Sequence, residues 1–100
     1  MAAAYPKFWF VYLLCCRDGT MYSGCTDNLL RRLTAHNTGR GARYTRARLP
    51  VRLVYWVRRQ GRARAQSYEA QLKRLPRKEK LALVAAHAKP HPPLKGGARA

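Results

Sequence analysis

Apolar side chains form short runs separated by turn residues, and these runs predict the strands. Phe8 to Cys15 is apolar at nearly every position, which is typical of a central strand buried on both faces. Thr20 to Cys25 follows an Asp-Gly pair and is expected to return beside the first strand as a hairpin. Leu49-Pro50 leads into a third expected strand, Val51 to Arg58.

The loop of this hairpin decides which face of the sheet each side chain occupies. A two-residue Asp-Gly loop would put Tyr12 and Tyr22 on opposite faces, because side chains alternate along a strand. A three-residue loop, Arg17 to Gly19, with its glycine left-handed in a bulge, would pair Tyr12 with Gly24. Both phenols would then share one face, and we predict this second loop.

The first expected helix lies between the hairpin and the third strand. Thr26 or Asp27 can cap its start, and it would run to about Asn37, where Gly39 and Gly41 end it. At 3.6 residues per turn, its buried stripe is predicted to consist of three leucines, Leu29, Leu30 and Leu33.

Two further helices are expected in the second half of the chain. One fits Ala63 to Leu75 and would bury a stripe of Ala65, Tyr68 and Leu72. Pro76 suits the first turn of the other, which would run toward Ala86. We therefore expect one α+β domain over residues 1–88, followed by a disordered basic tail rich in Pro and Gly over residues 89–100.

Basic residues dominate the charge of the chain. Lys and Arg number 21 and Asp and Glu four, which gives a net charge of +17 in 100 residues. Such a field gives sequence-independent, salt-sensitive binding to phosphates, so the expected partner is a polyanion. We expect no membrane partner, because no apolar run approaches the roughly 20 residues of a spanning helix. The first apolar run is followed by a turn, and no small-residue cleavage site is evident after it, which argues against a signal peptide.

The three cysteines are an odd number and fit reduced thiols in a cytoplasmic protein. The simplest interpretation is that they are small buried hydrophobic residues. A zinc site built from Cys15, Cys25 and His36 is the alternative, but it lacks a fourth well-spaced ligand.

Polar side chains on the edges of the helical stripes are candidates for a fixed chemical role. Arg32 and His36 lie one turn apart along the edge of the first helix, whereas Arg31 points to solvent. Glu69 has the same edge position on the second helix and is the one acid without an evident structural role. A solvated surface charge is the alternative interpretation for Arg32 and Glu69 taken singly.

A single carboxylate cannot build a two-metal site, so any metal chemistry would use one hard cation, with water and phosphate oxygens completing its octahedral shell. Without a second carboxylate as base, a phenol near the metal and several cations would activate water. Tyr12 and Tyr22 can supply that phenol. Each tyrosine alone, like His36 alone, has an ordinary structural interpretation, and the hypothesis depends on the order and spacing of the set.

The glycine-hinged segment from Gly39 to Arg48 is strongly basic and contains one aromatic residue. It could follow a phosphate backbone and stack a base. A solvated basic loop is the alternative. Its candidate nucleic-acid contacts are Arg40, Arg43, Tyr44, Arg46 and Arg48.

Several of these segments resemble GIY-YIG nucleases. Val11-Tyr12-Leu13 and Tyr22-Ser23-Gly24 look like the two signature tripeptides, and Asn28 to Asn37 matches the helix that follows them. Tyr68 to Lys73 looks like the helix bearing the metal-binding glutamate, and the segment that starts at Gly39 is similar to small stand-alone bacterial members. The resemblance covers about Trp9 to Val84.

The resemblance implies a three-stranded antiparallel sheet flanked by helices, in the order β-β-α-β-α-α. It also implies an endonuclease that hydrolyses DNA, structure-selective or nonspecific, in repair or recombination, with one Mg²⁺ or Mn²⁺ held by Glu69. Tyr12 or Tyr22 would be the general base or would orient the water, and the choice between them stays open. Arg32 would steady the charge on phosphate, and His36 would bind phosphate or assist proton transfer.

The chain also departs from the family pattern. Cys25 stands where some repair nucleases of the family have lysine, and Leu81 where they have asparagine. The alternative function is therefore a noncatalytic nucleic-acid-binding domain, RNA- or ribosome-associated, with a degenerate site. The complete set of Tyr12, Tyr22, Arg32, His36 and Glu69 favours the nuclease, because a binding module has no chemical need for it.

Overall fold

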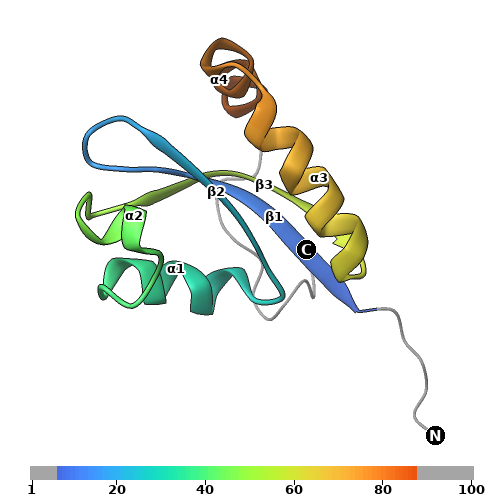
Figure 1. The fold of residues 1–100 in the computed structure, drawn as a ribbon, viewed down its shortest axis with the longest axis horizontal. Helices are drawn as coiled ribbons and strands as arrows, with labels where there is room; N and C mark the ends of the chain where they lie inside the picture. Colours follow the sequence, from blue (N-terminus) through green and yellow to red (C-terminus); the bar gives the residue numbers. More distant parts are fainter. Residues whose placement is uncertain (1–6, 88–100) are drawn as a thin grey trace, which may run out of the picture.

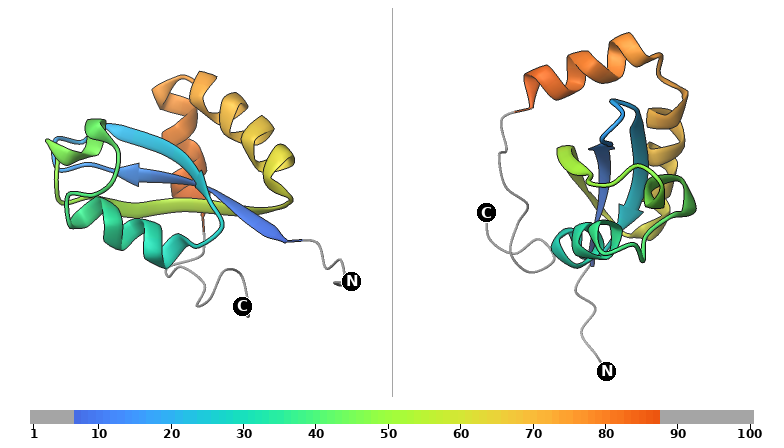
Figure 2. Two further views of the ribbon diagram at one scale, coloured as in Figure 1. Left: turned by 60° about the horizontal axis from the view of Figure 1, so that its bottom comes forward. Right: turned by 90° about the vertical axis from the view of Figure 1, so that its left-hand side faces the viewer.

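The computed structural model describes residues 7–87. Its elements are β1 (Phe8–Cys15), β2 (Met21–Thr26), α1 (Leu29–Asn37), α2 (Arg43–Arg46), β3 (Arg52–Gln60), α3 (Arg62–Arg74) and α4 (Arg77–Ala86). The strands form one antiparallel sheet in the order β2-β1-β3. Helices α1 and α3 lie on opposite faces of this sheet, and α4 continues from α3 (Figures 1 and 2). The expected α+β class and three-stranded antiparallel sheet are confirmed.

The β1–β2 hairpin has the predicted three-residue loop. Tyr12 pairs with Gly24, and the Gly19 N–H donates to the Cys16 carbonyl at 2.9 Å. Gly19 has φ of 85°, a left-handed conformation that glycine adopts without steric cost. As a result Tyr12 and Tyr22 both belong to the core on the α1 side of the sheet.

Helix α1 begins later than the expected caps would place it. Its N-cap is Asn28, whose side chain accepts the Arg31 N–H at 3.0 Å. The two residues predicted as caps have other roles, because β2 extends to Thr26 and the chain must turn before the helix can start. Thr26 Oγ1 accepts the Asn28 N–H, and Asp27 forms ion pairs with Lys7 and Arg31.

The buried stripe of α1 also differs from the prediction in one leucine. Leu29 is buried and Leu33 packs partly against the same core, but Leu30 is 45% exposed. The third buried member is His36, at 0% exposure. Positions 29, 33 and 36 recur at the i, i+4, i+7 spacing of one helix face, which leaves Leu30 about a quarter turn away from the sheet.

Alternate residues of β1 supply two separate cores. The α1-side core contains Phe10, Tyr12 and Leu14, and the α3-side core contains Val11 and Leu13. This two-sided burial explains why β1 is apolar at nearly every position. The stripe predicted for α3 is confirmed, since Ala65 and Leu72 are fully buried in the α3-side core and Tyr68 packs partly against it.

Several remaining expectations can be compared with the described residues. The segment from position 39 to 48 was expected as a loop but contains the single helical turn α2. Cys15, Cys16 and Cys25 are all free thiols. No helix within residues 7–87 is long and apolar enough to cross a membrane. The expected tail, residues 89–100, lies outside the described residues, and the domain boundary at residue 88 stays a prediction.

Candidate active site

The centre of the candidate site is a buried chain of hydrogen bonds that starts at Tyr12. The Tyr12 hydroxyl lies 3.2 Å from His36 Nε2, and His36 Nδ1 lies 2.8 Å from Thr45 Oγ1. Thr45 Oγ1 in turn donates to the Ala42 carbonyl at 3.0 Å. Thus β1, α1 and α2 each contribute one member, and Thr45 is a residue that sequence reasoning did not select.

This chain assigns the proton positions. A hydroxyl has one hydrogen, so Thr45 must accept from His36 if it donates to Ala42. His36 Nδ1 therefore carries the proton, and the bare Nε2 accepts a hydrogen bond from the Tyr12 hydroxyl. Tyr12 is the donor in this pair and His36 is neutral.

The electrostatic surroundings favour the same assignment. Burial, and to a smaller extent the charge of Arg32, lower the pKa of His36 from 6.5 to about 4. Burial raises the pKa of Tyr12 to about 12, although Arg32 beside it acts in the opposite direction. The charges of Tyr22 and Glu69 also raise the pKa of Tyr12. At neutral pH both Tyr12 and His36 are therefore uncharged.

Two glycines make room for this chain. A Cβ at Gly24, the β2 partner of Tyr12, would overlap with the Tyr12 hydroxyl, and a Cβ at Gly41 would overlap with the His36 ring. The absence of both side chains lets the phenol lie across β2 and lets the segment before α2 cover the imidazole. These close approaches could not be recognised from spacing, although Gly24 was matched as part of the second tripeptide.

Tyr22 is positioned by its rings and lies closer to solvent than Tyr12. Its ring meets His36 edge-on, with centroids 5.5 Å apart, and stacks on Tyr44 at 5.9 Å. Tyr22 is half-buried, whereas Tyr12 is only 2% exposed. Of the two phenols, Tyr22 is therefore the one that a substrate can approach.

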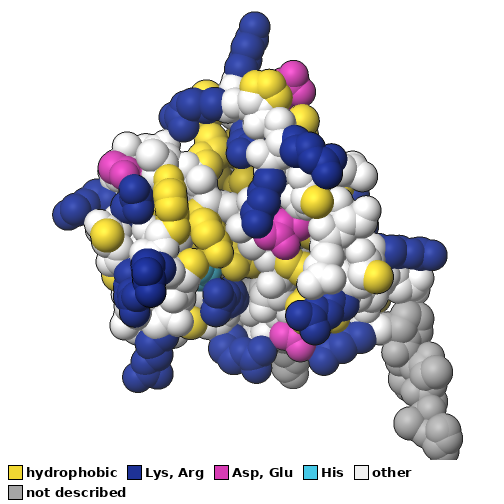
Figure 3. Space-filling model, viewed as in Figure 1, with side chains coloured by type: hydrophobic (Ala, Val, Ile, Leu, Met, Phe, Trp, Pro, Cys, Tyr) yellow, Lys and Arg dark blue, Asp and Glu magenta, His cyan; other side chains and the backbone are white. Residues whose placement is uncertain are grey.

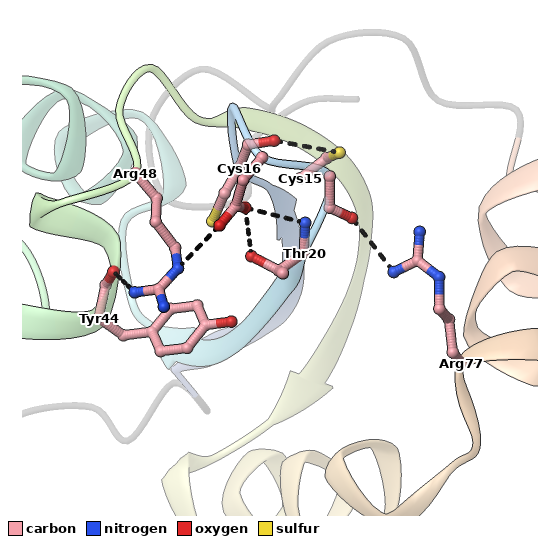
Figure 4. A network of polar contacts seen from close by, with 8 residues as sticks. Cys15, Cys16, Thr20, Tyr44, Arg48 and Arg77 are labelled. Atoms are coloured by element: carbon pink, nitrogen blue, oxygen red, sulfur yellow. Dashed lines mark hydrogen bonds and ion pairs between the residues drawn. The ribbon is translucent and has the colours of Figure 1, made fainter.

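A network of polar contacts at the hairpin holds Tyr44, the residue whose ring stacks on Tyr22; Figure 4 shows this network around Tyr44 and Arg48. The Arg48 guanidinium lies 3.9 Å from the centroid of the Tyr44 ring and donates to the Tyr44 carbonyl. Arg48 also pairs with Asp18 at 3.0 Å, and Thr20 donates to the same acid through its N–H and hydroxyl. Arg48 is thus engaged within the fold, whereas the other three candidate arginines of this segment, Arg40, Arg43 and Arg46, are exposed.

Glu69 approaches the cluster from α3. Its side chain is 19% exposed, and its carboxylate lies 3.3 Å from the ammonium of Lys73 on the next turn. It is near enough to influence the pKa of Tyr12 on the other side of the sheet. Among residues 7–87, no three His, Cys, Asp or Glu side chains gather as a metal-binding group. The zinc alternative is not supported, because Cys25 packs on the α3 side and His36 on the α1 side.

The surface above these residues is a shallow apolar hollow. Figure 3 shows apolar side chains between the α1–α2 side and α3, with Lys and Arg side chains around them. Arg32 is half-buried, as expected for an edge position, and Arg31 is exposed. The structure therefore brings Tyr12, Tyr22, Arg32 and His36 together, with Glu69 nearby on α3. Such a group can position an anion near a phenol and a single carboxylate.

Comparisons with known proteins agree with this arrangement. The model of the GIY-YIG catalytic domain matches residues 8–82. A UPF0213 protein of Nitratidesulfovibrio vulgaris is 54% identical over 79 residues, which cover 79% of this chain and 72% of that protein. The UPF0213 protein CPE1444 of Clostridium perfringens is 47% identical over 77 residues, covering 77% of this chain and 83% of that protein.

Two solved structures are also similar. The solution structure of the UPF0213 protein BH0048 from Bacillus halodurans has 38% identity and a TM-score of 0.51, covering 91% of this chain and 88% of that one. That of the protein EF2693 from E. faecalis has 37% identity and a TM-score of 0.53, covering 85% and 95%. With the matched domain spanning the sheet and the tyrosine, arginine, histidine and glutamate positions, the chain belongs to the GIY-YIG family.

Proposed function

We propose that this protein is a metal-dependent endonuclease that hydrolyses phosphodiester bonds in DNA, structure-selectively or without sequence preference, in repair or recombination. The observation that carries the proposal is the meeting of Tyr12, Tyr22, Arg32 and His36 beside Glu69, in a chain with four acids. The charge of +17 supplies attraction to the phosphate backbone. The exposed Arg40, Arg43 and Arg46, with Tyr44, would extend the binding surface.

In the proposed reaction, Tyr22 is the phenol that meets the attacking water. It is more accessible than Tyr12, and its ring is held by His36 and Tyr44. As phenolate, Tyr22 would take a proton from the water as the water oxygen attacks phosphorus. Tyr12, which is buried and donates to His36, would support the geometry of the site.

Arg32 and His36 have separate proposed roles. Arg32 lies next to both the Tyr12 hydroxyl and the His36 ring, where its charge would offset the negative charge that develops on the phosphate. The complete burial of His36 favours a role in holding the Tyr12 hydroxyl in place over direct contact with phosphate.

A single Mg²⁺ or Mn²⁺ would be held by Glu69. The residue fits a hard cation, because its side chain is partly exposed and, among residues 7–87, its ion pair is with a lysine whose side chain is 59% exposed. Magnesium commonly binds through one or two carboxylates, with water and phosphate oxygens completing its shell. When bound, the ion would polarise the phosphate and make the attacking water more acidic.

The proposal can be tested with the purified chain and its Glu69→Ala variant. Labelled single-stranded, duplex and branched DNA would be incubated with Mg²⁺, Mn²⁺ or chelator at moderate salt, which limits nonspecific binding. We expect metal-dependent nicking by the unmodified chain and none by the variant, with DNA binding nearly unchanged. Glu79→Ala, which removes an exposed acid from α4, is the matched control and should retain activity.

Tight binding without cleavage on every substrate would contradict the nuclease proposal. The function would then be that of a noncatalytic nucleic-acid-binding domain, for which the net charge alone is sufficient. Repeating the assay with RNA distinguishes the two nucleic acids as partners.

A further inference from the structure

A second cleft lies outside the cluster of catalytic candidates, between the β1–β2 hairpin and the start of α4. It has a volume of about 190 Å³ and is lined by Thr20, Met21, Tyr44, Arg77 and Lys80. This volume is below the roughly 300–1,000 Å³ of pockets that enclose whole drug-sized ligands. The cleft therefore suits one group of an extended molecule.

The charge of the lining identifies that group. Two of the five lining residues are cations, and none is acidic. Within residues 7–87 neither Arg77 nor Lys80 is in an ion pair: Asp18, Asp27 and Glu69 pair with other cations, and Glu79 pairs with none. Two positive charges without an ion-pair partner in a small cleft favour an anion, and a phosphate group can accept hydrogen bonds from both arginine and lysine side chains.

Arg77 is held in place at this cleft. Its Nη1 donates to the Gly19 carbonyl at 3.1 Å, so the side chain bridges α4 and the hairpin (Figure 4). A guanidinium has five N–H donors, which leaves others for a ligand. Lys80 follows almost one helical turn later on α4 and lines the same cleft.

Tyr44 connects this cleft to the catalytic candidates. Its ring stacks on Tyr22, and the same residue lines the cleft. Arg48 and the Tyr22 ring already contact the Tyr44 ring, so the edge and hydroxyl of Tyr44 are the parts best placed to meet a ligand. A strand that passes Tyr22 would reach the cleft directly beyond Tyr44.

We propose that this cleft binds a backbone phosphate of the nucleic-acid strand, on one side of the scissile bond. Arg77 and Lys80 are its cationic ligands, and Tyr44 forms the wall shared with the catalytic site. The proposal rests on the nuclease function proposed above and adds a substrate requirement: the strand must carry a phosphate flanking the one that is cleaved.

The test compares two double variants that remove the same charge. Arg77→Ala/Lys80→Ala removes the cleft cations, and Arg74→Ala/Lys78→Ala removes one exposed arginine and one exposed lysine that do not line the cleft. Binding of a labelled single-stranded DNA oligonucleotide would be measured by fluorescence anisotropy in chelator, across a salt series of about 50 to 200 mM. Working in chelator separates binding from cleavage.

We expect the cleft variant to bind about 10-fold more weakly than its charge-matched control. The slope of log affinity against log salt should fall in magnitude by about 0.7 relative to the control, the value for one single-strand phosphate contact. Equal affinities and slopes for the two variants would overturn the proposal. If the unmodified chain shows no metal-dependent nicking, the nuclease function is overturned. The comparison of DNA binding by the two double variants stays valid in that case.

A single variant and a competitor separate cleft binding from a folding defect and from capture of free phosphate. Lys80→Ala alone retains the Arg77 hydrogen bond to the hairpin, so reduced affinity in this variant with an unchanged urea midpoint supports the proposal without a folding defect. Inorganic phosphate would be titrated as a competitor of the oligonucleotide. If inorganic phosphate displaces the oligonucleotide at concentrations near those of the strand's own phosphates, the cleft is a site for the free anion. That result would overturn the proposal that it binds a backbone phosphate.

Discussion

The candidate site has one part on the α1 side of the sheet and another on the α3 side, and the two parts differ in burial and in hydrogen bonding. On the α1 side, Tyr12, His36 and Thr45 form a buried chain of hydrogen bonds. On the α3 side, Glu69 is partly exposed and pairs with a lysine on the helix surface. One part is assembled by folding, and the other remains open to an external partner.

The difference follows from the cost of removing polar groups from water. A buried imidazole or phenol without a hydrogen bond loses about 1–3 kcal/mol, so the α1-side groups must be paired in the folded state. An exposed ion pair contributes roughly 0–1 kcal/mol, so Glu69 can exchange Lys73 for another cation at little cost. Burial thus separates the residues that set geometry from the one that can take up a ligand.

The largest expected effect distinguishes the two tyrosines. Tyr22→Phe should lower DNA cleavage by about 100- to 10,000-fold, the usual contribution of a general base, with little change in binding or stability. Tyr12→Phe should instead destabilise the fold by about 1–3 kcal/mol, because buried His36 Nε2 loses its donor. Single-turnover cleavage and urea unfolding measure the two quantities. Full cleavage activity in Tyr22→Phe would contradict its assignment as base.

Acidification should selectively weaken the α1 side. The pKa of His36 is about 4 in the folded protein against 6.5 ordinarily, so between these values the unfolded chain binds a proton that the folded chain does not. This contribution is complete above pH 6.5 and is lost as the pH falls toward 4, on the order of 3 kcal/mol in total. Urea unfolding at several pH values measures the loss. An NMR titration of the imidazole with a midpoint near 6.5 would contradict the prediction.

Removing the far end of the hydrogen-bond chain should have an intermediate effect. Thr45→Val keeps the shape of the side chain but leaves His36 Nδ1–H without an acceptor, so we expect a loss of about 1–2 kcal/mol in unfolding free energy. Thr45→Ser retains the hydroxyl and is the matched control. If serine and valine destabilise equally, the hydroxyl does not hold the imidazole.

The smallest effect is expected on the α3 side. Lys73→Ala should change the unfolding free energy by no more than about 0.5 kcal/mol, since the lysine of this i,i+4 pair with Glu69 is exposed on the helix surface. It should lower the Mg²⁺ concentration needed for half-maximal cleavage, because the carboxylate loses a competing cation. Lys78→Ala, an exposed lysine of α4 outside any ion pair among residues 7–87, is the control. If both variants need the same Mg²⁺ concentration for half-maximal cleavage, Glu69 does not exchange Lys73 for the metal ion.

Local patterns were sufficient to predict much of the scaffold. The first strand was predicted with the bounds that β1 has, and the Arg17 to Gly19 loop correctly placed Tyr12 and Tyr22 on one face. The shared face follows from the strict alternation of side chains along a strand, because the length of the hairpin loop fixes which residues pair. The buried stripe of α1 was predicted less well. The prediction that Leu30 is buried was wrong, because the face that α1 turns toward the sheet depends on how the whole fold packs.

Sequence alone determined the order of the strands and of the three longer helices, the charge and the chemical types available for a site, because these depend on composition and on contacts between near neighbours. Only the tertiary structure decided that His36 is neutral and fully buried, that Thr45 holds it, and that Tyr12 and Tyr22 differ in access. These properties depend on desolvation and on hydrogen bonds between distant segments. Such contacts exist only after β1, α1 and α2 have packed together, so no spacing along the chain could reveal them.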